Sequence, residues 1–163
     1  MNDNAGTILL VEDDQNDVFF IQYAFEVANI TNPLQIVGDG QQAIDYLRGA
    51  GKYADRSRFA FPSLVLLDLK LPMKMGIDVL KWMHSQPSMR NLLVLVLTSS
   101  SNVEDIDEAY RFGARSYLVK PLSVEDRLEM ARLIKSYWLD LNQFPSIPVS
   151  APSGPGAARI VTS

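Results

Sequence analysis

Three short apolar runs constrain the fold of this chain more than any other feature of its sequence. They cover residues 7–11, 63–67 and 92–97, and none alternates cleanly between apolar and polar side chains. Near-continuous apolar runs of this length are typical of strands that are buried on both faces of a parallel sheet. Two weaker runs, at residues 34–37 and 116–119, bring the predicted number of strands to five.

The segments between these runs have helical periodicity. After Asp14, a candidate N-cap, Val18, Ile21 and Phe25 recur at the spacing of one helix face. Comparable patterns follow the other four runs, so strands and helices alternate along the chain. Right-handed crossovers in such an order place helices on both faces of the sheet. We therefore predict an α/β fold with a doubly wound, five-stranded parallel sheet.

The length and composition favour a single folded unit. A chain of 163 residues with 47% apolar side chains can fill one core without disulfides. We assign residues 1–145 to the domain and the Pro-, Ser- and Gly-rich residues 146–163 to a disordered tail. The connection at residues 48–63 is long, and we predict a surface loop there, with a partner-contacting loop as the alternative.

The charge balance and the absence of cysteine exclude several classes of function. The net charge of −4 has the wrong sign for binding the phosphate backbone of nucleic acid. The lack of Cys removes thiolate metal sites and cysteine nucleophiles and fits a reducing compartment. The sequence contains no apolar run of transmembrane length and does not start like a signal peptide. We expect a cytoplasmic protein that binds neither membranes nor nucleic acid directly.

Acidic side chains follow two of the predicted strands. Glu12 and Asp13 come after the first strand, and Asp68 comes after the third. Ligands of doubly wound sheets bind beyond the carboxyl ends of the strands, where these acids would converge. Three crowded carboxylates repel one another unless a cation joins them, and an all-oxygen set suits Mg²⁺.

A hydroxyl and an ammonium are predicted at the same edge. Thr98 ends the fourth strand and Lys120 follows the fifth. Together they could bind phosphoryl oxygens, and a carboxylate can act as a nucleophile toward phosphorus. Asp68 is the candidate nucleophile because it ends the most central strand. Each of these residues alone would more often be a cap or turn residue; their joint placement favours the chemistry.

The sequence resembles the receiver domain of bacterial two-component response regulators over about residues 5–140. The matching motifs stand at residues 8–14, 66–72 with Gly76, 96–99, 113–114 and 117–122. The resemblance implies a (βα)5 flavodoxin-like fold. It also implies that Asp68 accepts a phosphoryl group from the phosphohistidine of a sensor histidine kinase, while Thr98 and Lys120 contact the phosphoryl oxygens.

The resemblance further implies a metal site and a switch. Asp13, Asp68 and the backbone carbonyl of Lys70 would ligate Mg²⁺, and Glu12 would act through water. On phosphorylation the Thr98 hydroxyl would move toward the phosphate. Tyr117 would then turn into the vacated space and alter the surface of the last two helices and the fifth strand.

More particularly, the long loop and the end of the last helix resemble stand-alone regulators paired with phytochrome-type histidine kinases. Apolar residues cover more of that helix than one packing stripe needs. They are Met130, Leu133, Ile134, Tyr137, Trp138, Leu141 and Phe144. We therefore expect a homodimer through the last helix and the fifth-strand region; the alternative is that Trp138 and Phe144 fold back on their own domain.

Two other functions compete with this interpretation. A phosphatase of the haloacid dehalogenase type would also use Asp68 as its nucleophile, but it needs a second Asp where this chain has Lys70. An inactive pseudo-receiver would act only as a protein-interaction module. The presence of every required side chain argues against the pseudo-receiver, which stays as the alternative. We expect no classical enzyme: the protein would be a phosphoacceptor that assists its own phosphoryl transfer and autodephosphorylation.

Overall fold

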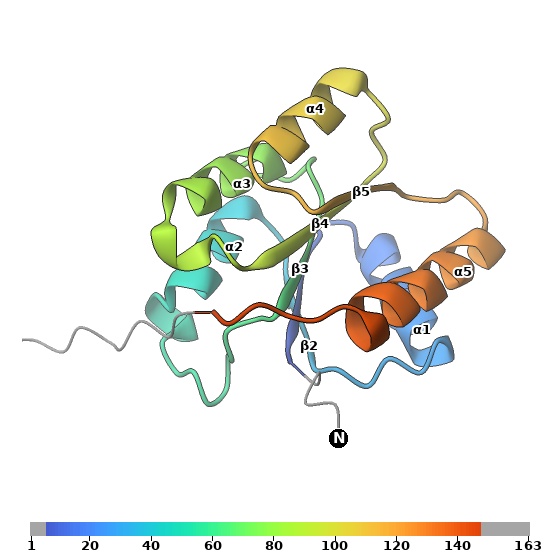
Figure 1. Ribbon diagram of the computed structural model, residues 1–163, viewed down its shortest axis with the longest axis horizontal. Helices are drawn as coiled ribbons and strands as arrows, with labels where there is room; N and C mark the ends of the chain where they lie inside the picture. Colours follow the sequence, from blue (N-terminus) through green and yellow to red (C-terminus); the bar gives the residue numbers. More distant parts are fainter. Residues whose placement is uncertain (1–5, 148–163) are drawn as a thin grey trace, which may run out of the picture.

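The computed structural model describes residues 6–147, which form one parallel sheet with helices on both of its faces (Figure 1). The strands are β1 (Ile8–Val11), β2 (Leu34–Val37), β3 (Leu64–Leu67), β4 (Leu93–Thr98) and β5 (Ser116–Val119). The main helices are α1 (Gln15–Val27), α2 (Gly40–Arg48), α3 (Gly76–Ser85), α4 (Val103–Arg111) and α5 (Val124–Ile134). Short 3₁₀ turns lie at η1 (Gly51–Tyr53) and η2 (Pro87–Met89), and α5 continues as the π-helix η3 (Lys135–Leu141).

The sheet has the order β2-β1-β3-β4-β5, with every neighbouring pair parallel. The chain therefore builds outward from β1 in one direction and then, from β3, in the other. The order reverses between β1 and β3, and a crevice opens beyond the carboxyl ends of strands at such a point. The predicted doubly wound, flavodoxin-like fold is confirmed.

Successive strand residues point to opposite faces and fill two separate cores. Leu9, Val65 and Val94 pack beneath α2, α3 and α4, whereas their neighbours in the strands pack against α1 and α5. All residues of β1, β3 and β4 are buried. These are the three strands with continuous apolar runs, so burial on both faces explains why none of the runs alternates.

The long connection at residues 48–63 packs against its own domain. Arg56 donates hydrogen bonds to the carbonyl oxygens of Tyr46 and Leu47 at the end of α2, and to that of Phe59. The ring of Tyr53 is buried and lies 5.1 Å from that of Tyr46. The loop is thus fixed by side-chain contacts that no local sequence pattern displays.

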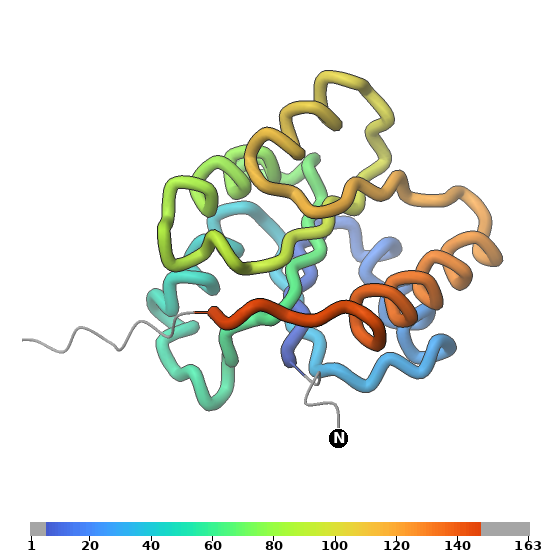
Figure 2. Tube along the Cα trace, viewed as in Figure 1, coloured from blue at the N-terminus to red at the C-terminus, as the bar shows by residue number. Residues whose placement is uncertain are grey.

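Beyond η3 the chain returns across the edge of the sheet where the strands begin (Figure 2). The Asn91 side chain donates a hydrogen bond to the Ser146 carbonyl at 3.0 Å, and Ile147 packs against the core beneath α2 and α3. Trp138 and Phe144 pack against the other core. Residues 148–163 of the predicted tail lie outside the described residues. Within residues 6–147, no helix is long and apolar enough to cross a membrane.

Candidate functional site

Carboxylates from two strand ends meet at one edge of the sheet. Glu12 and Asp13 follow β1, and Asp68 follows β3. Their carboxylate oxygens all lie within 4.8 Å of one another. Glu12 and Asp68 are buried whereas Asp13 is exposed, so solvent reaches the cluster from one side. The predicted convergence of these three acids is confirmed.

Backbone pairing fixes the position of Asp68. Val11 of β1 pairs with Leu67 of β3, and the Asp68 N–H donates to the Val11 carbonyl at 3.0 Å. The start of α3 then closes against the same backbone: a Cβ on Gly76 would lie 2.0 Å from the Asp68 carbonyl oxygen. Only glycine permits so close an approach, so Gly76 helps to hold the segment that carries Asp68.

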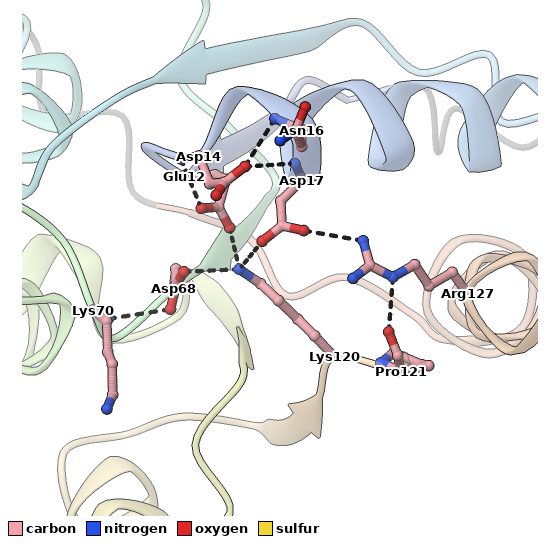
Figure 3. Close-up of polar contacts among 9 residues, drawn as sticks. All are labelled: Glu12, Asp14, Asn16, Asp17, Asp68, Lys70, Lys120, Pro121 and Arg127. Carbon is pink, nitrogen blue, oxygen red and sulfur yellow. Dashed lines mark hydrogen bonds and ion pairs between the residues drawn. The ribbon is translucent and has the colours of Figure 1, made fainter. Parts of the chain in front are cut away.

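Lys120 lies at the centre of the charge cluster (Figure 3). Its Nζ is 2.5 Å from Glu12 Oε2, 2.9 Å from Asp17 Oδ2 and 2.8 Å from Asp68 Oδ2. An ammonium has three N–H donors, so these three carboxylates use all of them. The Lys120 side chain is only 9% exposed.

The electrostatics of the cluster follow from burial and from these hydrogen bonds. Burial opposes the charge of Lys120, but its bonds to Asp68, Glu12 and Asp17 outweigh burial and raise its pKa well above the usual value. Burial raises the pKa of Glu12 to about 7, although hydrogen bonds from Lys120 and from the Asp14 N–H act against this rise. The site therefore holds a firmly charged lysine beside a carboxyl whose negative charge is opposed by burial and favoured by that lysine.

Asp17, which no sequence pattern singles out, joins the cluster from the first turn of α1. Asp14 is confirmed as the N-cap of this helix, because its carboxylate accepts the N–H groups of Asn16 and Asp17. The other carboxylate oxygen of Asp17 accepts a hydrogen bond from Arg127 of α5 at 3.0 Å. An acidic residue in a first helical turn normally interacts with the helix dipole, which conceals this role.

Thr98 and Tyr117 lie on the other side of the site. Thr98 ends β4 and is fully buried, yet within residues 6–147 its Oγ1 is the one buried side-chain oxygen or nitrogen without a hydrogen-bond partner. Buried hydroxyls are normally paired, so this orphan is unusual. The Tyr117 hydroxyl donates to the Ser100 carbonyl in the β4–α4 loop at 2.9 Å. Both predicted switch residues therefore lie beside the site. The Thr98 hydroxyl has no hydrogen-bond partner among the described residues, whereas the Tyr117 hydroxyl is held by a loop carbonyl.

Lys70 follows the cluster along the chain. Its backbone N–H donates to Asp68 Oδ1 at 3.1 Å, which orients that carboxylate. Its side chain is exposed and extends away from Glu12 and Asp68 in Figure 3. The backbone of Lys70 thus lies beside the acid cluster, while its ammonium group stays outside.

The donor set fits a hard divalent cation. Glu12, Asp13 and Asp68 offer only carboxylate oxygens, and these are close enough to share one ion. Such oxygens are the ligands that Mg²⁺ prefers, and the exposed side of the cluster leaves room for water and for phosphoryl oxygens.

A flavodoxin-like sheet whose strand ends carry three acids, a hydroxyl and a lysine is the architecture of a receiver domain. Residues 8–132 match the family model for the response regulator receiver domain. The chain therefore belongs to this family, whose members are typically not classical enzymes.

Two relatives with known names place the chain within the family. It is 40% identical over 141 residues to the probable methanogenesis regulatory protein FilR2 of Methanothrix harundinacea, covering 85% of this chain and 86% of FilR2. It is 35% identical over 139 residues to the response regulator Rcp1 of Synechocystis, covering 85% and 92% of the two chains.

Two solved structures resemble the fold closely. The crystal structure of the phosphorylated cyanobacterial phytochrome response regulator RcpA has a TM-score of 0.79 at 36% identity and covers 86% of this chain and 99% of that one. The Mn²⁺-bound form of Rcp1 has a TM-score of 0.79 at 34% identity with the same coverage. A divalent ion is thus bound by a relative with this fold.

Proposed function

We propose that the protein is a stand-alone response regulator that accepts a phosphoryl group on Asp68. The observation that carries this proposal is the Lys120 ammonium, which lies 2.8 Å from the Asp68 carboxylate beside a cluster of acids able to share a divalent ion. A single positive group cannot neutralise so many carboxylates. The surplus negative charge supports a cation site at the acceptor.

The chemistry is an in-line displacement at phosphorus. A carboxylate oxygen of Asp68 attacks the phosphorus of a phosphohistidine, a P–O bond forms, and the P–N bond breaks with its electron pair staying on the imidazole nitrogen. Asp13, Asp68, the Lys70 carbonyl and, through water, Glu12 would hold Mg²⁺. When bound, the ion would offset the charge on the phosphoryl oxygens.

Two side chains of the protein would bind the transferred group. The Lys120 ammonium is already aimed at Asp68, and the unpartnered hydroxyl of Thr98 lies at the same edge of the sheet. A phosphoryl oxygen would supply the partner that Thr98 lacks. Movement of Thr98 would then open space for the Tyr117 ring. The Tyr117 hydroxyl would give up its hydrogen bond to the Ser100 carbonyl and move inward.

The proposed donor is a sensor histidine kinase of the phytochrome type, in the cytoplasm. The basis is the likeness to Rcp1 and RcpA, the latter a cyanobacterial phytochrome response regulator. No chromophore would bind to the regulator itself. The fold carries no nucleic-acid-binding element among the described residues, so the signal would leave by a protein contact or by onward transfer of the phosphoryl group.

We further propose a homodimer through α5, η3 and β5. Trp138 and Phe144 pack inside their own domain, but Leu133, Tyr137 and Leu141 remain 59%, 53% and 70% exposed. These three residues recur every four positions and form one apolar stripe. Light scattering at tens of micromolar protein, with and without beryllium fluoride as a phosphoryl mimic, should detect the dimer. A monomer in both states would refute it.

The test of the main proposal is an intact-mass measurement. Wild type and Asp68→Asn are each incubated with acetyl phosphate and Mg²⁺. Wild type should gain about 80 daltons, the mass of one phosphoryl group on a carboxylate, and Asp68→Asn should gain nothing. No gain in wild type would refute the proposal and favour a pseudo-receiver that acts only as an interaction module.

A further inference from the structure

Asp17 connects the acceptor site to α5 by two charged contacts. Its Oδ2 lies 2.9 Å from Lys120 Nζ, and its Oδ1 lies 3.0 Å from Arg127 Nη1. The carboxylate therefore bridges a cation inside the site and a cation on the neighbouring helix. Figure 3 shows Asp17 between these two groups.

Arg127 is fixed in place from two other directions. Its Nε donates to the Pro121 carbonyl at 2.7 Å, and its guanidinium lies 5.2 Å from the centre of the Phe20 ring on α1. Since Pro121 directly follows Lys120, the contacts form a closed ring: Lys120 to Asp17, Asp17 to Arg127, and Arg127 back to the chain beside Lys120. A displacement of Lys120 thus reaches Arg127 by two routes.

The carboxylate partners of Lys120 differ in whether a second cation is at hand to replace the lysine. Glu12 is only 2% exposed, and Lys120 is the cation that it contacts. Asp17 is 21% exposed and already contacts a second cation, Arg127. Burial acts to raise the pKa of Asp17, but hydrogen bonds and charge from Lys120 and Arg127 outweigh it and lower the pKa, so the carboxylate is ionised and free to stay with either cation.

Phosphorylation changes the competition for Lys120. A phosphoryl group carries about two negative charges at neutral pH, more than the single charge of the carboxylate that it covers. The N–H that Lys120 directs to Asp68 can pass to one phosphoryl oxygen, but the other two are held by Glu12 and Asp17. A further hydrogen bond to the phosphoryl group therefore requires one of these two contacts to open. The contact that costs least to give up is the one to Asp17, since Arg127 keeps that carboxylate paired.

We propose that Asp17 is a positioning residue that releases Lys120 to phosphorylated Asp68 and remains with Arg127, so that α5 responds to the phosphorylation state. This inference rests on the proposed function. A small cavity of about 20 Å³ lies between α1 and α5, and Asp17, Phe20, Lys120 and Arg127 are among the residues that line it.

The test is NMR of wild type and variants with and without acetyl phosphate and Mg²⁺, with intact mass as a parallel readout. In wild type, phosphorylation should shift the Arg127 Nε–H resonance and the backbone amides of Leu128 and Ala131. Asp17→Asn should still gain the phosphoryl mass but lose these α5 shifts, while the Ser100 amide still responds. Asp14→Asn is the matched control: it removes one charge from the same helix end, keeps a good N-cap, and should retain the α5 shifts.

A second variant keeps the proposal falsifiable if Asp17→Asn folds poorly. Arg127→Gln should lose the Leu128 and Ala131 shifts to the same extent, and the double variant should lose no more than either single one, because both residues act through one ion pair. Phosphorylated Asp17→Asn or Arg127→Gln with wild-type α5 shifts would overturn the inference alone. A wild type that gains no mass would overturn the proposed function and this inference together.

Discussion

The two sides of the acceptor site are built in opposite ways. On the side of β4 and β5, the Thr98 hydroxyl has no hydrogen-bond partner, and Tyr117 is held by a loop carbonyl. On the side of α1 and α5, every N–H of the Lys120 ammonium has a carboxylate partner. One side lacks a contact, and the other has no donor to spare.

This difference determines how each side could respond to a phosphoryl group. Thr98 can gain a hydrogen bond and break none, so its response requires only a small movement. Lys120 can give a second N–H to the phosphoryl group only by leaving Glu12 or Asp17, and Asp17 keeps a partner because it also contacts Arg127. The hydroxyl side and the charged side should therefore be separable by mutation.

The largest expected effect comes from removing the cation of the charged side. Lys120→Met leaves the buried carboxylates of Glu12 and Asp68 without compensation, so the free energy of unfolding in Mg²⁺-free buffer should fall by about 3–5 kcal/mol. Urea denaturation measures this change.

Lys81→Met is the matched control for that substitution. Lys81 pairs with Glu108 at 2.6 Å, but their side chains are 42% and 36% exposed. Exposed pairs contribute less than about 1 kcal/mol. Equal losses in the Lys81 and Lys120 variants would contradict the difference between a buried cluster and an ordinary surface pair.

Substitutions on the side of Thr98 and Tyr117 should change the free energy of unfolding less, and the two substitutions should change it in opposite directions. Thr98→Val removes an unpaired buried hydroxyl at nearly constant volume, and it should raise the free energy of unfolding by about 1 kcal/mol. Tyr117→Phe removes a hydroxyl that has a partner and should lower it by about 1 kcal/mol. Destabilisation by Thr98→Val would mean that its hydroxyl is paired in solution.

The smallest effect is a pH dependence carried by Asp17. Its pKa in the folded protein lies below the ordinary value of 3.8, so its contribution to stability is complete above that pH and is lost as the pH falls through the lowered pKa. The free energies of unfolding of wild type and Asp17→Asn should therefore converge as the solution is acidified below about pH 4. Urea denaturation at several pH values across that range measures this convergence. Parallel curves would show that Asp17 gains nothing from Lys120 and Arg127.

The fold could be predicted from sequence because burial leaves a direct pattern. β1, β3 and β4 are buried on both faces, and each appears in the sequence as an unbroken apolar run. The acid cluster was predictable for a related reason. Glu12 and Asp68 directly follow paired strands, so topology alone brings them together.

The charged side could not be predicted in the same way. Asp17 lies in the first turn of α1, where an acid is ordinary because it complements the helix dipole, and Arg127 lies near the start of α5. Their pairing depends on how two helices pack across one face of the sheet, which hydrophobic periodicity does not specify. Arg56, which fixes the long loop through backbone carbonyls, went unpredicted for the same reason.

Calorimetric titration with Mg²⁺ tests most directly whether this sheet edge is a divalent-ion site built for phosphoryl transfer. Wild type should bind one ion per chain, and Asp13→Asn should bind it much more weakly, because that variant removes the one exposed carboxylate of the cluster. Absence of Mg²⁺ uptake by wild type, or equal uptake by both proteins, would contradict the account.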